Sequence, residues 1–204
     1  MNLFFDFDGV ILDSLDIKEI GFRKIFSQYS DLNVNKLIHY HNQNLGKSRF
    51  IKIKYFYNQI LKKEISSKKI NYYANCFSAT MKINLANKSK LIPKTINFIK
   101  KNYKKNKFFI VSGTEEKELI WLCKKLGINK FFYEICGSPT PKEKLIECII
   151  KQYCLLKSNS ALIGDSLNDY EAASYNKILF YGYNSVNLNS TKYNYISNLG
   201  PIIS

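Results

Sequence analysis

The chain has 204 residues, and 46% of them are hydrophobic, which is enough to bury a core and excludes a disordered or fibrous protein. Its 31 lysines and arginines outnumber 16 acidic residues, giving a formal net charge of +15. Only Arg23 and Arg49 are arginines, and the lysines are spread along the chain, so compositional bias explains this charge better than a nucleic-acid site.

The sequence also carries few signs of a membrane or a secreted protein. No secretory signal and no apolar stretch long enough to cross a bilayer is present, so we expect a cytoplasmic protein without a membrane partner. The cysteines show no CxxC spacing, which favours buried free thiols over disulfides or a zinc site. They are Cys76, Cys123, Cys136, Cys148 and Cys154. The sequence does not indicate an oligomeric state.

Short apolar runs alternate with helical patterns along most of the chain. The runs predict buried β-strands over residues 2–8, 107–112, 131–136, 160–165 and 178–181. The helical patterns cover residues 93–103, 115–126 and 141–153. This alternation predicts an α/β fold, a Rossmann-like doubly wound parallel sheet.

The connection between the first two strands is far longer than one crossover helix requires. It contains only amphipathic helical stretches, over residues 15–29, 35–42, 48–62 and 66–86. We therefore expect an inserted all-helical cap domain over residues 15–87, and a core domain formed by residues 1–14 and 88–204.

Polar motifs follow four of the predicted strands, at the edge where open parallel sheets place their ligands. The first motif contains Asp6, Asp8 and Gly9. Two carboxylates two residues apart allow one to attack a phosphorus atom while the other transfers protons. Gly9 would let the backbone approach a phosphate closely. An ordinary Asp-Gly turn after a strand is the structural alternative.

The next two motifs offer groups that bind anions. Ser112 and Gly113 stand at a strand-to-helix turn, where a hydroxyl and free N–H groups can form an anion site. Lys142 lies just inside a predicted helix start, where a cation opposes the helix dipole and so suggests a role other than helix stability. A solvated Lys142 is the alternative, and Lys144 is a rival for the same role.

The fourth motif is Gly164 followed by Asp165 and Asp169, directly after an apolar run. Hard cations such as Mg²⁺ prefer clustered carboxylate oxygens. Helix capping by Asp165 or Ser166 would also explain acids at this position.

Taken together and in this order, the four motifs resemble the signature of the haloacid-dehalogenase superfamily. The resemblance covers the whole chain, and the stretches DFDGVILDS and GDSLNDYEAA are its most specific parts. The helical insertion after the first strand resembles the cap of the phosphoglycolate-phosphatase and β-phosphoglucomutase branch.

The resemblance implies a Mg²⁺-dependent phosphatase that hydrolyses a small phosphate monoester, such as a sugar phosphate or a phosphoglycolate-like metabolite. By similarity, Asp6 is the nucleophile that forms a phospho-aspartyl intermediate, and Asp8 is the acid and base. Mg²⁺ would be held by Asp6, the carbonyl of Asp8, Asp165 and Asp169. The phosphate would be held by Gly9, Ser112, Gly113 and Lys142.

The segment Asn44 to Lys52 resembles the element by which caps of this branch bind a second anionic group. It makes Ser48, Arg49 and Lys52 candidate substrate contacts, although Ser48 as a helix cap beside a solvated Arg49 is the alternative. The nearby His39 and His41 show no metal-ligand pattern, and we expect them on a helix surface.

Two departures from the mutases favour hydrolysis over isomerisation. No histidine follows the first motif closely, and the fourth motif begins Gly164-Asp165 where mutases tend to have Glu-Asp. A phosphosugar mutase remains the second hypothesis, and a non-enzymatic nucleic-acid-binding module the third. Phosphonate chemistry through a Schiff base on Lys52 or Lys54 ranks lower, as does dehalogenation.

Overall fold

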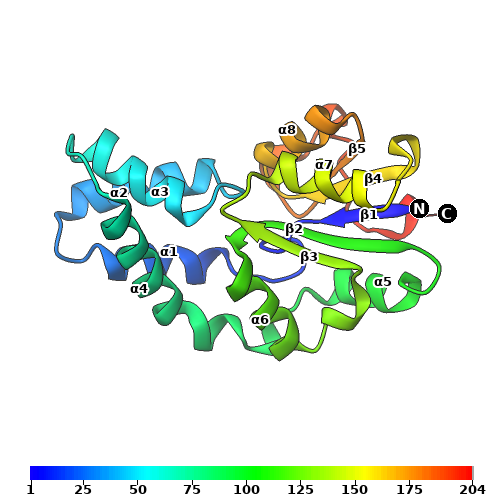
Figure 1. The fold of residues 1–204 in the computed structure, drawn as a ribbon, viewed down its shortest axis with the longest axis horizontal. Helices are drawn as coiled ribbons and strands as arrows, with labels where there is room; N and C mark the ends of the chain where they lie inside the picture. The colour runs from blue at the N-terminus through cyan, green and yellow to red at the C-terminus, as the bar shows by residue number, and fades with distance from the viewer. Residues whose placement is uncertain (204) are drawn as a thin grey trace.

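The computed structural model describes residues 1–203, which contain a five-stranded parallel sheet in the order β3-β2-β1-β4-β5 (Figure 1). The strands are β1 (Asn2–Phe5), β2 (Lys107–Glu115), β3 (Glu134–Ser138), β4 (Ser160–Gly164) and β5 (Leu179–Gly182). The central strand β1 pairs with β2 on one side and with β4 on the other. The predicted α/β class with a parallel sheet is confirmed.

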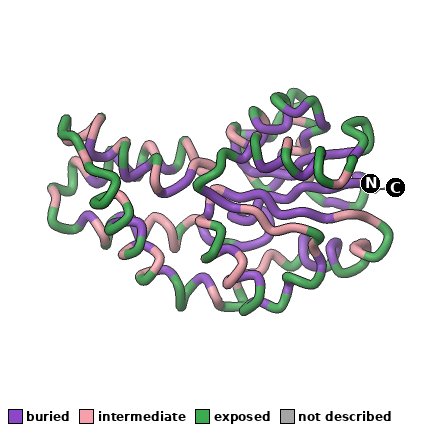
Figure 2. The backbone as a smooth tube through the Cα atoms, in the orientation of Figure 1, coloured by how far each residue is buried: buried purple, intermediate pink, exposed green. Residues whose placement is uncertain are grey.

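Helices cover both faces of the sheet because alternate strand residues point to opposite sides. The core helices are α5 (Pro93–Asn102), α6 (Glu116–Leu126), α7 (Lys142–Gln152) and α8 (Leu167–Asn176). Leu3 and Phe5 pack with α5 and α6, whereas Phe4 and Phe109 pack with α7 and α8. The three inner strands β1, β2 and β4 are accordingly buried along most of their length, whereas the edge strands β3 and β5 are only partly buried (Figure 2).

The long connection after β1 is entirely helical and lies beyond the carboxyl ends of the strands (Figure 1). Its helices are α1 (Leu15–Ile25), α2 (Asp31–Gln43), α3 (Arg49–Tyr55), continued by a π-helical turn (Phe56–Ile60), and α4 (Ser67–Leu85). We call residues 15–85 the helical insertion. Aromatic rings fill its interior, where Phe26 lies against Phe56 and Phe22 against Phe77, with ring centroids 4.2 and 4.6 Å apart. These residues belong to the hydrophobic cluster that also contains Leu3 and Phe5 of the sheet.

The two chain segments that join the helical insertion to the core run side by side. The N–H of Asp13 donates to the carbonyl of Lys90 (2.8 Å), and that of Ile92 donates to Ile11 (2.9 Å). The insertion is therefore tied to the core by a paired double connection close to the end of β1.

Some details differ from the sequence prediction. Strand β1 ends at Phe5, so Asp6 and Asp8 lie in the loop that follows it. Helix α8 was not predicted as a helix. All five cysteines are free, but only Cys123 is buried as predicted, since Cys76 and Cys136 are partly exposed and Cys148 and Cys154 are exposed. Among residues 1–203, no helix is both long enough and apolar enough to cross a membrane.

Candidate active site

The carboxyl edge of the sheet gathers three buried carboxylates. Asp6 directly follows β1, and its N–H continues the ladder by donating to Ile163 at the end of β4 (3.0 Å). This pairing brings Asp6 beside Asp165, which follows β4. Carboxylate oxygens of Asp6, Asp165 and Asp169 all lie within 4.8 Å of one another.

One lysine lies among these carboxylates. Lys142, at the start of α7, is buried, and its Nζ is 3.0 Å from Oδ1 of Asp6 and also contacts Asp169. Asp169 holds the start of α8 as well, because its Oδ2 accepts from the N–H (3.1 Å) and the hydroxyl (2.6 Å) of Ser166. Lys142 therefore lies at this edge of the sheet, whereas Lys144, the rival considered from the sequence, binds the half-buried Glu147 on the surface.

The charges in this cluster do not balance, since three carboxylates share one ammonium. Burial and the neighbouring charge of Asp169 raise the pKa of Asp6 to about 7. Burial and the charge of Asp6 raise the pKa of Asp165 well above its ordinary value. For Lys142, burial would lower the pKa, but Asp169 and Asp6 outweigh it and raise it.

The donor set fits a hard divalent cation. Its ligands are carboxylate oxygens, which Mg²⁺ prefers, and the cluster carries excess negative charge. In addition, Oδ1 of Asp165 is buried and has no hydrogen-bond partner among the described residues. A buried acceptor without a donor is costly, and a cation would satisfy it.

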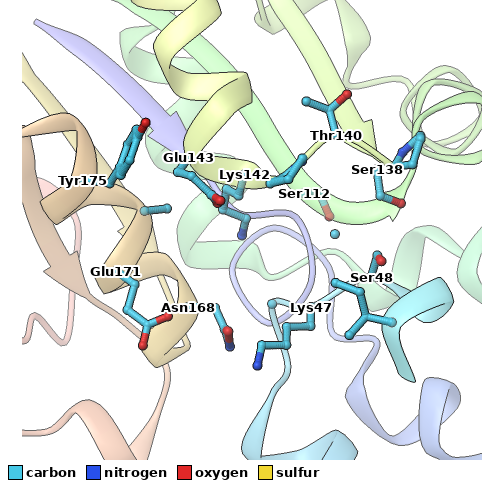
Figure 3. Close-up of a pocket in the computed structure, with 16 residues that line it drawn as sticks. Lys47, Ser48, Ser112, Ser138, Thr140, Lys142, Glu143, Asn168, Glu171 and Tyr175 are labelled. Atoms are coloured by element: carbon cyan, nitrogen blue, oxygen red, sulfur yellow. The ribbon is translucent and has the colours of Figure 1, made fainter. Parts of the chain in front are cut away.

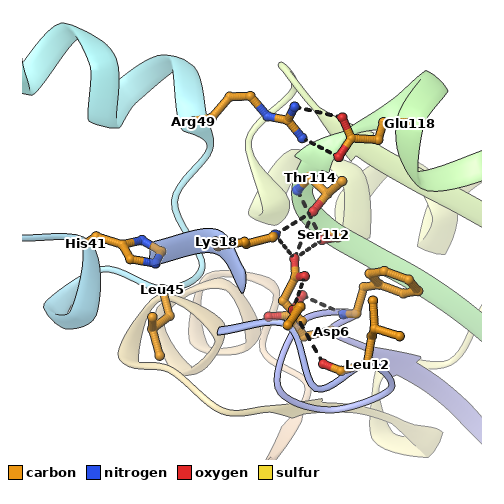
Figure 4. Close-up of polar contacts among 12 residues, drawn as sticks. Asp6, Leu12, Lys18, His41, Leu45, Arg49, Ser112, Thr114 and Glu118 are labelled. Carbon is orange, nitrogen blue, oxygen red and sulfur yellow. Dashed lines mark hydrogen bonds and ion pairs between the residues drawn. The ribbon is translucent and has the colours of Figure 1, made fainter. Parts of the chain in front are cut away.

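Asp8 lies in a different environment from Asp6, although only one residue separates them. Its Oδ1 accepts from the hydroxyl of Ser14 (2.6 Å), and its Oδ2 accepts from Thr114 Oγ1 (2.8 Å) and from Lys18. Burial would raise the pKa of Asp8, but the ammonium of Lys18 and these hydrogen bonds lower it to about 2. Figure 4 shows Lys18 reaching this network from the helical insertion.

Three of the four predicted phosphate-binding residues lie around a cleft of about 410 Å³ between the helical insertion and the core, and Gly9 is not among its lining residues. Ser112, Gly113 and Lys142 line it. Figure 3 shows Lys47 and Ser48 of the insertion side facing the core residues across this cleft. Its size is within the range of small-molecule sites.

The two glycines of the predicted site make close contacts that a side chain would prevent. Gly9 has a φ of +75°, and a Cβ there would meet the carboxylate of Asp165 at 1.9 Å. Its N–H donates to the carbonyl of Leu12 (2.8 Å). A Cβ on Gly113 would lie 2.4 Å from the carbonyl oxygen of Gly46, so the insertion approaches the core most closely here.

A second, smaller cavity of about 20 Å³ lies next to Asp8 on the side of the helical insertion, and we call it the inner chamber. It is lined mainly by cationic and aromatic side chains, which include Lys18, Lys52, Arg49 and Phe22, together with Thr114. A volume of this size holds about one water molecule. In this conformation the inner chamber therefore has no room for an organic group.

The three predicted cap contacts have different surroundings. Ser48 lines the larger cleft and precedes α3 without capping it through its side chain. The guanidinium of Arg49 forms a bidentate ion pair with Glu118 of α6 (2.7 and 2.9 Å) and also contacts Ser78 (Figure 4). Arg49 thus binds a carboxylate of the core in this structure.

Lys52 is a buried cation without a carboxylate partner among the described residues. Its Nζ lies 2.7 Å from Nδ1 of His41 and 3.3 Å from the carbonyl of Leu45. Burial, together with the nearby Lys18, lowers the pKa of Lys52 well below 10.5. Burial and the charge of Lys52 lower the pKa of His41 to about 2, so this imidazole is neutral.

Sequence reasoning missed three residues of this region: Lys18, His41 and Glu118. His41, expected on a helix surface, is buried with Val34, Leu37 and Ile38, and this i, i+3, i+4, i+7 stripe was readable from the sequence. Lys18 lies about one helical turn after Ser14, but no pattern marked it out. Glu118 could not be found, because its partner Arg49 is 69 positions away.

Comparison with known proteins places the chain in a family. The sequence model of the haloacid dehalogenase-like hydrolases matches residues 3–182. The chain belongs to this family and is therefore an enzyme of the hydrolase class. No curated protein sequence matches the chain.

Several solved structures share the fold at low sequence identity. A predicted phosphoglycolate phosphatase from Haemophilus somnus has a TM-score of 0.75 at 17% identity, covering 99% of this chain and 96% of its own. CbbY from Rhodobacter sphaeroides, in complex with phosphate, has a TM-score of 0.75 at 13% identity, and the match covers 96% of this chain and 92% of CbbY. β-Phosphoglucomutase from Clostridium difficile has a TM-score of 0.72 at 15% identity, and the match covers 97% of this chain and 90% of the mutase. The whole chain, including the helical insertion, thus follows a known architecture.

Proposed function

We propose that this hydrolase is a Mg²⁺-dependent phosphatase that cleaves a small phosphate monoester through a phospho-aspartyl intermediate on Asp6. The observation that carries the proposal is the pairing of two aspartates with separate environments. Asp6 lies in the carboxylate cluster with Lys142, whereas Asp8 is held by hydroxyl and ammonium donors outside it. Such a division suits one carboxylate that attacks and another that transfers protons.

The residues of the chain would share the work as follows. Asp6 attacks phosphorus, and the ammonium of Lys142 and the hydroxyl of Ser112 bind the phosphoryl oxygens. Asp8 gives a proton to the leaving oxygen and later takes one from the water that releases phosphate. The lowered pKa of Asp8 beside Lys18 favours the carboxylate form, which is the form that accepts this second proton.

We propose Asp6, Asp165, Asp169 and the carbonyl oxygen of Asp8 as the Mg²⁺ site. The bound ion would offset the excess negative charge of the cluster and of the phosphoryl group. This role agrees with the raised pKa values of Asp6 and Asp165, because both groups become easier to ionise next to a cation.

We propose that residues 15–87 form a cap that opens to admit substrate and closes over the reaction. Because the inner chamber holds only about 20 Å³, the organic group of a substrate cannot enter this chamber unless the helical insertion moves. Lys52 lines the inner chamber and Ser48 lines the larger cleft, so each is placed to contact a different part of the substrate. Arg49 would do so only after its release from Glu118. A sugar phosphate or a phosphoglycolate-like metabolite remains the proposed substrate class.

The test is phosphate release from p-nitrophenyl phosphate, a panel of sugar phosphates and phosphoglycolate, with Mg²⁺ at about 5 mM to fill a weak oxygen site. We expect metal-dependent release that falls by about 10⁴-fold or more in Asp6→Asn, since that variant lacks the nucleophile. Asp13→Asn, an exposed aspartate outside the site, is the matched control and should stay active.

Two results would contradict the proposal. One is folded protein that releases no phosphate from any member of the panel. The other is a phosphosugar that is isomerised without release of phosphate, which would indicate a mutase.

A further inference from the structure

The larger cleft, of about 410 Å³, differs in chemistry from the inner chamber. The inner chamber is lined mainly by cationic and aromatic side chains, whereas hydroxyl, amide and carboxylate groups line the larger cleft (Figure 3). Outside the predicted phosphate site, these groups include Ser48, Ser138, Thr140, Asn168, Glu143 and Glu171.

Two carboxylates of the larger cleft have no partner in the protein. Glu143 follows Lys142 at the start of α7, and Glu171 lies about one turn inside α8. Neither side chain forms an ion pair or a hydrogen bond with any residue of the described part of the chain. Because the chain has 31 basic residues against 16 acidic ones, partners are abundant elsewhere, and these two carboxylates stay available to a ligand.

Cations are fewer than carboxylates in this part of the cleft. Two of the described lining residues are lysines, and one of them, Lys142, is already bound by two carboxylates of the core cluster. The other is Lys47 of the helical insertion. Arg49 lines the inner chamber instead of the cleft and is paired with Glu118. The cleft beyond Lys142 therefore carries an excess of negative charge.

A hydroxyl group on the wall of the cleft also has no partner. Ser138 ends β3 and lines the cleft, and it is 2% exposed. Its Oγ forms no hydrogen bond with the described residues, which is costly for a buried hydroxyl. Figure 3 shows Ser138 across the cleft from Glu171 and Tyr175. A ligand that fills the cleft would thus have a hydroxyl group on one side and carboxylates on the other.

The larger cleft adjoins the proposed reaction centre. Ser112 and Lys142, the proposed phosphate contacts, line it, and it shares Lys47 and Gly113 with the inner chamber. A ligand whose phosphate lies at Asp6 can therefore extend its other end into the cleft. The volume of about 410 Å³ is within the range of sites for small organic molecules.

We propose that the larger cleft binds the end of the substrate opposite the phosphate, and that Glu143 and Glu171 select an ammonium on a hydroxylated group. The inference rests on the phosphatase function proposed above and narrows its substrate class to an amino sugar phosphate. An ammonium would form charged hydrogen bonds with the two carboxylates, whereas a carboxylate at the same place would meet like charge. A phosphoglycolate-like acid is therefore disfavoured.

Three compounds with the same kind of phosphate ester test this selection. Glucosamine 6-phosphate carries an ammonium on its sugar, glucose 6-phosphate is neutral there, and 6-phosphogluconate carries a carboxylate. At pH 7 we expect kcat/KM for phosphate release to fall by about tenfold at each step in this order.

The double variant Glu143→Gln, Glu171→Gln keeps hydrogen-bonding groups but removes both charges. Its kcat/KM values for the three compounds should agree within about threefold. Glu147→Gln is the matched control, because it removes a carboxylate of the same helix that does not line the cleft, and it should keep the full order. If the double variant does not fold, the exposed Glu171→Gln alone should reduce the differences.

The outcomes separate this inference from the proposed function. A wild type that releases no phosphate from these compounds or from p-nitrophenyl phosphate would refute the phosphatase itself. Dissociation constants from calorimetry would still test the cleft, and they should follow the same order. A wild type that cleaves or binds 6-phosphogluconate as well as glucosamine 6-phosphate would overturn the inference. So would an order that persists unchanged in the double variant.

Discussion

The core side and the insertion side of the candidate site carry opposite charges and are built differently. On the core side, Asp6, Asp165 and Asp169 crowd around Lys142 at the ends of β1 and β4 and at the start of α8. On the insertion side, Lys18 and Arg49 each bind a carboxylate of the core, and Lys52 binds none. Carboxylates at one edge of the sheet suit a metal and a phosphoryl group, whereas cations on a helical layer suit contact with substrate and with the core.

The comparison suggests where each function is sensitive to change. The core cluster is destabilised by its own charge and should become more stable when a carboxylate is neutralised. The ion pairs of Lys18 and Arg49 with the core are buried. Removal of one partner should therefore destabilise the protein or displace the partner that remains.

Of the changes that compare the two sides, Asp165→Asn is expected to have the largest effect, although a smaller one than Asp6→Asn. Loss of a proposed metal ligand should raise the activation barrier by several kcal/mol. Mg²⁺-dependent phosphate release should therefore slow by a factor on the order of 10³. Without metal, the same change should raise the melting temperature, because it removes both the burial cost of the carboxylate and its repulsion by Asp6, which raise the pKa of Asp165. Activity assays and thermal melts with and without Mg²⁺ measure both effects.

The exposed Asp13→Asn change serves as the control, and it should retain both the activity and the Mg²⁺-dependent rise in melting temperature. A metal-dependent rise in Asp165→Asn as large as in the wild type would show that the cation binds elsewhere.

The contrast between the two sides also explains what could be predicted from the sequence. The core motifs follow strands, and the rule that parallel strands end at one edge is enough to bring Asp6 and Asp165 together. Strand boundaries were less accurate, since β1 ends before Asp6. Helix α8 was missed because it turns small residues, Ala172 and Ala173, toward the sheet and so lacks an apolar stripe.

On the insertion side, the sequence indicates a helix but not its partner. Arg49 stood out as a rare arginine, yet nothing in the local spacing predicts the carboxylate of Glu118 beside it. Such contacts form where the helical insertion packs against the core, and residues so far apart in the sequence leave no local pattern. His41 is the exception, because its helical stripe could have indicated burial.

An intermediate effect is expected for Glu118→Gln, which breaks the ion pair between α6 and the helical insertion. The side chains of Arg49 and Glu118 are only 4% and 8% exposed, so loss of one partner should lower the free energy of unfolding by about 3 kcal/mol at neutral pH. Burial would raise the pKa of Glu118, but Arg49 lowers it below its ordinary 4.5 in the folded state. The stabilisation is therefore complete above pH 4.5 and is lost as the pH falls through the lowered pKa.

Urea unfolding of both proteins from pH 7 downward tests this prediction, because the difference between them should shrink only below the ordinary pKa of glutamate. Glu147→Gln, at an exposed ion pair with Lys144 and Lys151, is the matched control and should change stability little. A difference between wild type and Glu118→Gln that is independent of pH would mean that shape, not charge, supports the contact.

The smallest effect on stability, and one of opposite sign, is expected for Lys52→Met. Lys52 is buried with only His41 and a backbone carbonyl as partners, and burial holds its pKa well below 10.5. Replacing it by an apolar side chain of similar length should raise the free energy of unfolding by about 1 kcal/mol. If Lys52 contacts substrate, kcat/KM should fall at the same time by about tenfold or more, as for loss of a hydrogen bond from a charged group.

Thermal melts and kcat/KM on the best substrate of the panel measure the two effects together, with the exposed Lys54→Met as the control. A residue kept for stability alone would show the reverse pattern, a lower melting temperature with unchanged kcat/KM. A gain of stability with a loss of activity would mean that Lys52 is kept at a destabilising position because the substrate requires it there. In this respect Lys52 would differ from Lys18 and Arg49, each of which has a carboxylate partner.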